Sequence, residues 1–188
     1  MKLLNLKTLA LATAMTTMFL SGTSMAQNVT TVPVNATVQN AITLAVINPL
    51  NFGTIVAIND STETATASVA TTDAITFTRT NAPAFSQAVG GTPSAGEVTL
   101  DGVVGATINV TLNNIVAPTD GTDTFTIGTW LYDVNGAGST SITPGTPITY
   151  TATALDTFLV GATITTPAQA GLIGDGAYVG SFDLVASY

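Results

Sequence analysis

The feature that most constrains this chain is an apolar residue at every second position in many short segments. From residue 32 to 46, seven of the eight even-numbered positions are apolar, while the odd-numbered positions between them are mostly polar. Successive side chains of a strand point to opposite sides, so a period of two predicts a β-strand with one buried face. The run is longer than an ordinary strand of about 5–6 residues. Asn40 is the natural place to divide it.

The same alternation returns along the rest of the chain. The alternating segments lie around residues 75–78, 106–113, 125–127, 148–152, 162–164 and 178–188. The β-branched residues Val, Ile and Thr supply most of them, and these residues suit a pleated sheet. Turn-forming pairs such as Asn135-Gly136 and Pro144-Gly145 separate the segments. The stretch from Thr62 to Thr72 is interpreted only as rich in Thr and Ala.

These patterns predict an all-β fold. Eight or nine short strands separated by turns favour an immunoglobulin-like sandwich of two sheets, and a closed barrel is the alternative. No segment after residue 26 has the spacing of an amphipathic helix. The chain contains no cysteine, so the sandwich must be held by apolar packing and sheet hydrogen bonds. We expect one sandwich domain, residues 40–188.

The first 26 residues have the layout of a secretory signal. Lys2 and Lys7 precede an uncharged apolar stretch, residues 9–20, and Ser24-Met25-Ala26 places small residues at the cleavage site. About 12 apolar residues are too few to span a bilayer, which needs about 20. We therefore expect cleavage after Ala26, export of the protein, and no membrane span in the mature chain.

The charges exclude several classes of function. After cleavage Arg79 is the remaining basic residue, against eleven acidic ones, and nucleic-acid binding needs basic residues to neutralise phosphates. Electrostatic binding to anionic lipid headgroups also needs basic residues, so it is excluded for the same reason.

Histidine and cysteine are absent, which removes the commonest general base, the thiol nucleophile and the commonest transition-metal ligands. Acidic turns such as Asp120-Gly121 fit turn formation better than calcium binding. We predict a protein that is not an enzyme, with no catalytic residue, no metal and no cofactor.

Two aromatic residues, Trp130 and Tyr132, lie on one face of a predicted strand. Exposed aromatic rings can stack on sugars, but such a pair more often packs in a core or at a sheet edge. Core packing is the favoured interpretation. Ligand stacking by Trp130 and Tyr132 is the alternative.

Both ends of the mature chain resemble known families. The opening segments Ile42-Thr43-Leu44 and Leu50-Asn51-Phe52-Gly53-Thr54-Ile55 are similar to the subunits of archaic chaperone–usher pili and to the spore-coat U family. They also resemble the opening of an uncharacterised bacterial family of secreted domains. The closing residues 176–188 and the preceding residues 160–164 resemble the closing part of that uncharacterised family. The likeness covers about the first 30 and the last 30 residues of the mature chain, and the middle is similar only in strand rhythm.

In pilins of that kind the sandwich lacks one strand, and an N-terminal extension of the neighbouring subunit fills the open groove. The resemblance therefore implies an N-terminal extension, residues 27–39, with a donor strand at residues 29–38. The residues implied as groove plugs are Val32, Val34, Ala36 and Val38. Pro33 argues against this role, because proline removes one hydrogen-bond donor from a strand. The alternative is that residues 29–46 form one self-contained first strand.

The resemblance also implies a role for the last strand, which a periplasmic chaperone or the edge of the groove engages. Its alternating residues are Phe182, Leu184, Ala186 and Tyr188. Many pilins of this class carry a disulfide, which this chain cannot form.

The implied function is a non-catalytic structural subunit of a surface fibre or pilus that polymerises by strand donation, with adhesion as an additional expected role. Its partners are then further copies of itself, a periplasmic chaperone and an usher. The implied location is the periplasm and then the surface or exterior of a Gram-negative bacterium. The alternative function is a self-contained secreted module that binds carbohydrate or matrix.

Overall fold

In a computed structural model of the chain, the described residues are 33, 35, 36, 41–56, 64–79, 86–167 and 173–188. The chain divides into two units after residue 38, and residues 39–188 hold every strand described below. Strands, turns and irregular segments make up the described residues, which confirms the predicted all-β class. None of these residues forms an apolar helix long enough to cross a membrane.

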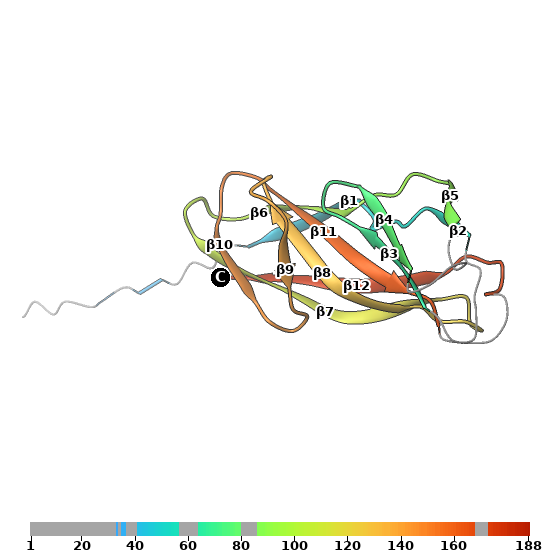
Figure 1. The fold of residues 1–188 in the computed structure, drawn as a ribbon. Helices are drawn as coiled ribbons and strands as arrows, with labels where there is room; N and C mark the ends of the chain where they lie inside the picture. Colours follow the sequence, from blue (N-terminus) through green and yellow to red (C-terminus); the bar gives the residue numbers. More distant parts are fainter. Residues whose placement is uncertain (1–32, 34, 37–40, 57–63, 80–85, 168–172) are drawn as a thin grey trace, which may run out of the picture. The chain divides into compact units, whose positions relative to one another are not determined.

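The described residues form twelve strands, and all their pairings are antiparallel (Figure 1). The strands are β1 (Thr43–Asn48), β2 (Thr54–Val56), β3 (Ala65–Val69), β4 (Ile75–Arg79), β5 (Ser86–Gly90), β6 (Gly96–Asp101), β7 (Thr107–Thr119), β8 (Thr126–Val134), β9 (Thr140–Ile142), β10 (Ile148–Thr151), β11 (Asp156–Thr165) and β12 (Val179–Ser187).

β11 is the central strand of the larger, seven-stranded sheet. One edge of β11 pairs with β6 over residues 156–160 and then with β3 over residues 162–165. The other edge pairs with β8. β1 extends the sheet beyond β6, β4 extends it beyond β3, and β9 extends it beyond β8.

The smaller sheet has β7 in the middle, with β10 on one edge and β12 on the other. The inward residues of β7, Ile108, Val110 and Leu112, are completely buried and share one core with Leu100 and Phe158 of the larger sheet. Figure 1 shows β7 and β12 crossing the layer that contains β8 and β11. Two sheets with a shared apolar core between them, and a second apolar cluster around Ala65 and Phe125, confirm the predicted sandwich. β2 and β5 form a separate two-stranded ribbon.

Gly161 marks the point where the edge partner of β11 changes from β6 to β3. A Cβ at this position would lie 2.5 Å from the carbonyl oxygen of Val69. Atoms of this kind do not approach so closely, so any larger residue would push β3 away from β11. Glycine therefore allows one long strand to carry two partners on the same edge.

β3 lies in the stretch that the sequence interpretation treated as rich in Thr and Ala only, and that interpretation is wrong for residues 65–69. Ala65, Ala67 and Val69 are completely buried and alternate with Thr66 and Ser68. Alanine is a weak strand former, so small side chains concealed a genuine period of two. Short strands of this kind explain why the structure has more strands than the eight or nine expected.

A backbone irregularity in β8 supports a stability prediction. Thr129 has a φ of 47°, in the left-handed region, where a β-branched residue is strained. It lies at the bulge where the pairing of β8 with β11 slips, between the pairs Gly161–Leu131 and Thr163–Gly128. Asparagine tolerates this conformation better than threonine does.

We expect Thr129→Asn to raise the free energy of unfolding by about 1 kcal/mol, which corresponds to about 2–4 °C in Tm for a domain of this size. Thermal unfolding followed by circular dichroism measures the change. Thr126→Asn is the matched control: Thr126 is an exposed threonine of the same strand with an ordinary φ. An equal effect in both variants would contradict the strain at residue 129.

Candidate functional site: a groove between two free strand edges

Two strand edges face each other across an opening in the sandwich. β1 is the last strand of the larger sheet and β12 is the last strand of the smaller sheet. Within the described part of the chain, β1 pairs only with β6 and β12 pairs only with β7. Each strand therefore keeps one edge whose backbone N–H and C=O groups are available to another strand.

β1 and β12 run in opposite directions. Thr43, at the start of β1, pairs with Asp101, and the backbone N–H of nearby Val103 donates to the Tyr188 hydroxyl just after β12 (2.9 Å). The start of β1 and the end of β12 therefore lie at one end of the domain, which we call the entry end. The opposite end, where β12 begins at Val179, is the distal end.

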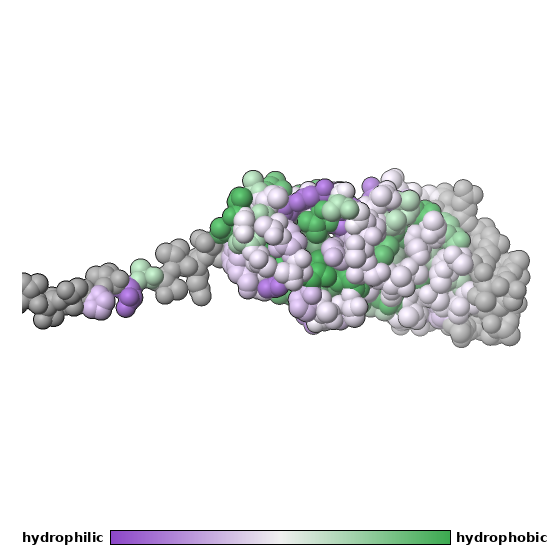
Figure 2. All heavy atoms as spheres, turned by 60° about the vertical axis from the view of Figure 1, so that its left-hand side comes forward, coloured by the Kyte–Doolittle hydropathy of each residue, from purple (hydrophilic) through white to green (hydrophobic). Residues whose placement is uncertain are grey.

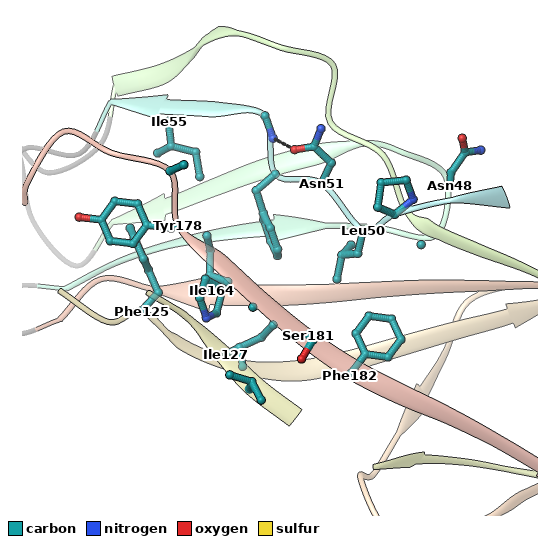
Figure 3. A pocket seen from close by; sticks show the side chains of 18 of the residues that line it. Asn48, Leu50, Asn51, Ile55, Phe125, Ile127, Ile164, Tyr178, Ser181 and Phe182 are labelled. Atoms are coloured by element: carbon teal, nitrogen blue, oxygen red, sulfur yellow. Dashed lines mark hydrogen bonds between the residues drawn. The ribbon is translucent and has the colours of Figure 1, made fainter. Parts of the chain in front are cut away.

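A groove of about 1230 Å³ lies between these two edges. One wall is formed by β1 and the chain that leads from it into β2, and the other by residues 180–185 of β12. Figure 3 shows Leu50 and Ile55 on one side, opposite Phe125, Ile127 and Phe182. The apolar residues that line its distal part are Ile55, Phe125, Ile127, Ile164, Ile173 and Tyr178.

The apolar face of β1 is uncovered. All six residues of the strand are exposed, and Val46 is 73% exposed although it is apolar. Leu44 and Val46 line the groove. The period of two predicts that these side chains lie on a buried face, but Leu44 is 39% exposed and Val46 73% exposed, so the prediction is wrong for Val46 in the single chain.

Two glycines shape the walls. A Cβ on Gly96 would lie 3.4 Å from the backbone nitrogen of Leu50 and 3.6 Å from the ring of Phe182, which are ordinary contact distances, so Gly96 lies directly beneath these two residues. A Cβ on Gly180 would lie 2.6 Å from the carbonyl oxygen of Val116. This close approach lies in the irregular part of the β7–β12 pairing and keeps the wall close to β7.

The wall that follows β1 is held by hydrogen bonds rather than by a regular strand. The backbones of Asn51 and Ser94 exchange two N–H···O bonds of 2.9 Å. The Ser94 hydroxyl donates to the Pro49 carbonyl (2.9 Å), and the Gly53 N–H donates to Asn51 Oδ1 (2.8 Å). The groove is thus preformed on this side.

An acidic turn lies beside the distal end of the groove. Backbone N–H groups of Asp123 and Thr122 donate to Asp120 Oδ1 (2.7 and 2.8 Å) and hold the pKa of this carboxyl below its usual value. Burial raises the pKa of Tyr178 to about 12, and the charges of Asp120 and Asp123 add to the shift. The Tyr178 ring packs edge-on against Phe125 with centroids 4.8 Å apart. These groups fix the turn and the aromatic end of the groove.

The groove has little chemistry beyond shape and apolar surface. Its carboxylate at Asp183 accepts a hydrogen bond from Asn114 Nδ2 (2.7 Å). Across the ranges that the structure describes, no cluster of three or more His, Cys, Asp or Glu residues could hold a metal ion. Pockets for small molecules measure about 300–1000 Å³, so this longer, open groove is better suited to an extended peptide.

Residues 41–188 match the family described as a domain of unknown function, DUF4402. The chain belongs to this family. Searches of curated proteins and of solved structures found no match. The family agrees with the predicted resemblance to an uncharacterised domain family. None of the comparisons names pilins or spore-coat proteins, so that resemblance stays a prediction.

The C-terminal strand of the DUF4402 domain has the predicted alternation. Phe182, Leu184 and Ala186 are half-buried and pack against the main core, and Phe182 and Leu184 also line the groove. Tyr188 follows the strand and is 47% exposed. Its hydroxyl is bound to the loop after β6, as described above, and it does not line the groove.

The two aromatic residues singled out in the sequence belong to the interior of the DUF4402 domain. Trp130 is 4% exposed and packs against Phe182, with ring centroids 5.2 Å apart. Tyr132 is half-buried and stacks on Phe158 at 5.6 Å. Ligand stacking by Trp130 has no support, because the ring presents almost no surface to solvent.

The proposed donor residues lie mostly outside the described part of the chain. Val32, Val34 and Val38 are not among the described residues, and Ala36 is exposed without regular structure. The structure therefore leaves their role a prediction.

Sequence reasoning missed the wall formed by Leu50, Phe52 and Ile55. A signal was present, because residues 50–55 were singled out as a motif of the resemblance. The spacing of these apolar residues could have indicated a second groove wall.

Proposed function

We propose that this protein is a non-catalytic structural subunit of a surface fibre, in which each groove receives residues 29–38 of another copy as an added strand. The observation that carries the proposal is the apolar groove between two free strand edges, β1 and β12. Backbone hydrogen bonds along such an edge provide affinity, and pockets for alternate side chains provide specificity.

The sequence of the extension fits this groove. Val32, Val34, Ala36 and Val38 share one face of an extended strand, so their side chains would all point toward the apolar lining. Burying a valine contributes about 1.5–3 kcal/mol, and the four residues together about 5–10 kcal/mol before the cost of ordering the strand. Each copy carries both this groove and an extension, so assembly can continue from copy to copy.

Pro33 limits the register of the added strand. It has no N–H group to donate, so we expect it where the strand needs no hydrogen bond to the groove edge. Pro33 lies between Val32 and Val34 in the sequence, so in an extended strand its side chain lies on the opposite face from the valines. The proline is therefore compatible with strand addition in one of the two alternating ladder positions.

An open apolar groove needs protection before assembly. Uncovered strand edges promote aggregation, and the groove carries two of them. The proposal therefore includes export by the N-terminal signal and a periplasmic chaperone that occupies the groove until an usher mediates assembly, as the pilin resemblance implies.

A peptide of residues 28–39 tests the proposal directly. Mature protein refolded from denaturant is expected to form oligomers that resist mild heating in detergent. Refolding with excess peptide should give monomers that carry one peptide each, because the groove is then occupied. Size-exclusion chromatography with light scattering, and mass spectrometry of the complex, measure both results.

The control peptide carries asparagine in place of Val32, Val34 and Val38 and should leave the oligomers unchanged. If mature protein is a stable monomer without any peptide, strand donation is wrong. A self-contained secreted binding module would then be the better description.

A further inference from the structure

The entry end of the domain exposes a group of apolar side chains that the groove does not use. Val103 and Val104 lie in the loop between β6 and β7, and Leu155 lies in the loop between β10 and β11. Val104 is 68% exposed and Leu155 is 61% exposed. We call Val103, Val104 and Leu155 the apolar tip. Figure 2, in which this side of the domain is turned forward, shows hydrophobic side chains gathered there.

The apolar tip is held in place by hydrogen bonds. The two loops are joined by Gly105 N–H to the Ala152 carbonyl and by Ala152 N–H to the Ala106 carbonyl, both 2.9 Å. Val103 N–H donates to the hydroxyl of Tyr188 (2.9 Å). These bonds hold the valines outward on a fixed loop. Apolar side chains exposed together in this way are unfavourable in water unless another molecule covers them.

Strand β1, which follows the N-terminal extension in the sequence, begins beside the apolar tip. Thr43 pairs with Asp101, two residues before Val103. Residues 39–42 separate β1 from the proposed donor strand, and four residues reach at most about 14 Å when fully extended. If the donor strand of one copy lies in the groove of the next, the apolar tip must therefore lie close to the end of that groove.

The direction of strand addition decides which end this is. A donor antiparallel to β12 would run from the entry end of the groove to its distal end. Antiparallel ladders are slightly more stable than parallel ones and more common. β12 is also the longer of the two free edges, with nine residues against six in β1. The donor would then leave the groove at the distal end, beside Val179.

Resting on the function proposed above, we propose that the apolar tip docks on Val116 and Val179 at the distal end of the next copy. These two residues lie on the paired strands β7 and β12 and are 52% and 69% exposed, and Val116 is also at the margin of the groove, which it lines. Both surfaces present aliphatic side chains, so their contact would bury apolar area on each copy. The contact would fix the angle between successive subunits, which a strand with a short linker alone would leave free.

Cysteine cross-linking tests this contact in the intact mature protein, because the natural chain has no cysteine. The double variant Val104→Cys, Val179→Cys is assembled and then treated with a short bis-maleimide. We expect a ladder of covalent multimers in a denaturing gel. Each single variant should give at most traces of dimer, because residue 104 then meets no cysteine on its neighbour.

The matched control replaces Ser141, an exposed residue of β9, together with Val179, and should give no ladder. Light scattering before cross-linking separates this proposal from the one it rests on. Polymers that form but do not cross-link through residues 104 and 179 overturn the tip contact alone. Dimers formed by Val104→Cys alone would show that tips meet tips, which also overturns it. Absence of polymers overturns strand donation and the tip contact together.

Discussion

Mature protein carrying Val34→Asp is expected to remain folded but to lose assembly. Val34 is in the middle of the four alternating residues proposed to enter the groove, so the substitution would place a carboxylate against an apolar lining. An unpaired buried charge costs several kcal/mol, and the contribution of the valine, about 1.5–3 kcal/mol, is lost as well. Together these changes exceed half of the apolar stabilisation expected for the donor strand. Light scattering after refolding should show monomers in place of polymers.

Asn35→Asp is the matched control for this variant. It adds the same charge one residue further along, on the opposite face of an extended strand. Polymers of this control should form as in the unsubstituted protein. Equal loss of assembly in both variants would mean that a charge on either face of the extension prevents assembly. This result would contradict insertion of alternate side chains into the groove.

The class and architecture of the fold could be predicted from the period of two. The segments around residues 106–113 and 178–188 contain strong alternation, and they became β7 and β12. β3 was missed because Ala65 and Ala67 are small, although both are completely buried. Strands can therefore be predicted from the sequence where the alternating apolar residues are large. Where close packing needs small residues, the pattern becomes faint.

The groove could be predicted only through the resemblance. Alternation along β1 indicates an apolar face, but it does not say which element covers that face. In β7 the equivalent residues, such as Val110, are completely buried, whereas Val46 in β1 is 73% exposed. The difference depends on the position of β1 as the last strand of its sheet, which is a property of the assembled topology. The pilin resemblance implies an open groove, whereas local sequence does not.

The apolar tip has no sequence signal of its own. Val103-Val104 follows a turn-forming Asp101-Gly102 pair and resembles the start of another buried strand. Val104 is exposed because the loop is fixed by bonds to Ala152 and Tyr188, residues far away in the sequence. The periodicity of a sequence does not predict long-range hydrogen bonds of this kind.

Asp156 is a buried carboxylate whose loss should destabilise the domain. It is completely buried at the start of β11. Its carboxylate accepts hydrogen bonds from Asn135 Nδ2 (2.6 Å), from the backbone N–H of Thr153 (3.0 Å) and from the Thr153 hydroxyl. Asn135 also accepts from the N–H of Thr157 (2.8 Å). One carboxylate thus joins the turn after β8 to the loop before β11.

Asp156→Ala should lower the free energy of unfolding by about 2 kcal/mol, because the donors of Asn135 and Thr153, two exposed residues, lose a charged acceptor. Urea unfolding at neutral pH measures the loss, and the fluorescence of Trp130 in the core reports the transition. Asp101→Ala is the matched control, since Asp101 is an exposed aspartate and its replacement should change stability by less than about 0.5 kcal/mol. Similar losses in both variants would contradict a structural role for the buried carboxylate.

The effect of Asp156→Ala should also depend on pH. Burial acts to raise the pKa of Asp156, but the hydrogen bonds from Thr153 and Asn135 outweigh it, and the pKa is lowered from its usual value of 3.8. A carboxyl with a lowered pKa in the folded state stabilises the protein above its unfolded pKa, and that contribution is lost as the pH falls through the folded value. The difference in unfolding free energy between the natural protein and Asp156→Ala should therefore be constant from pH 7 to about pH 5 and shrink below pH 4. A difference that grows on acidification would mean that the natural carboxyl is protonated in the folded protein.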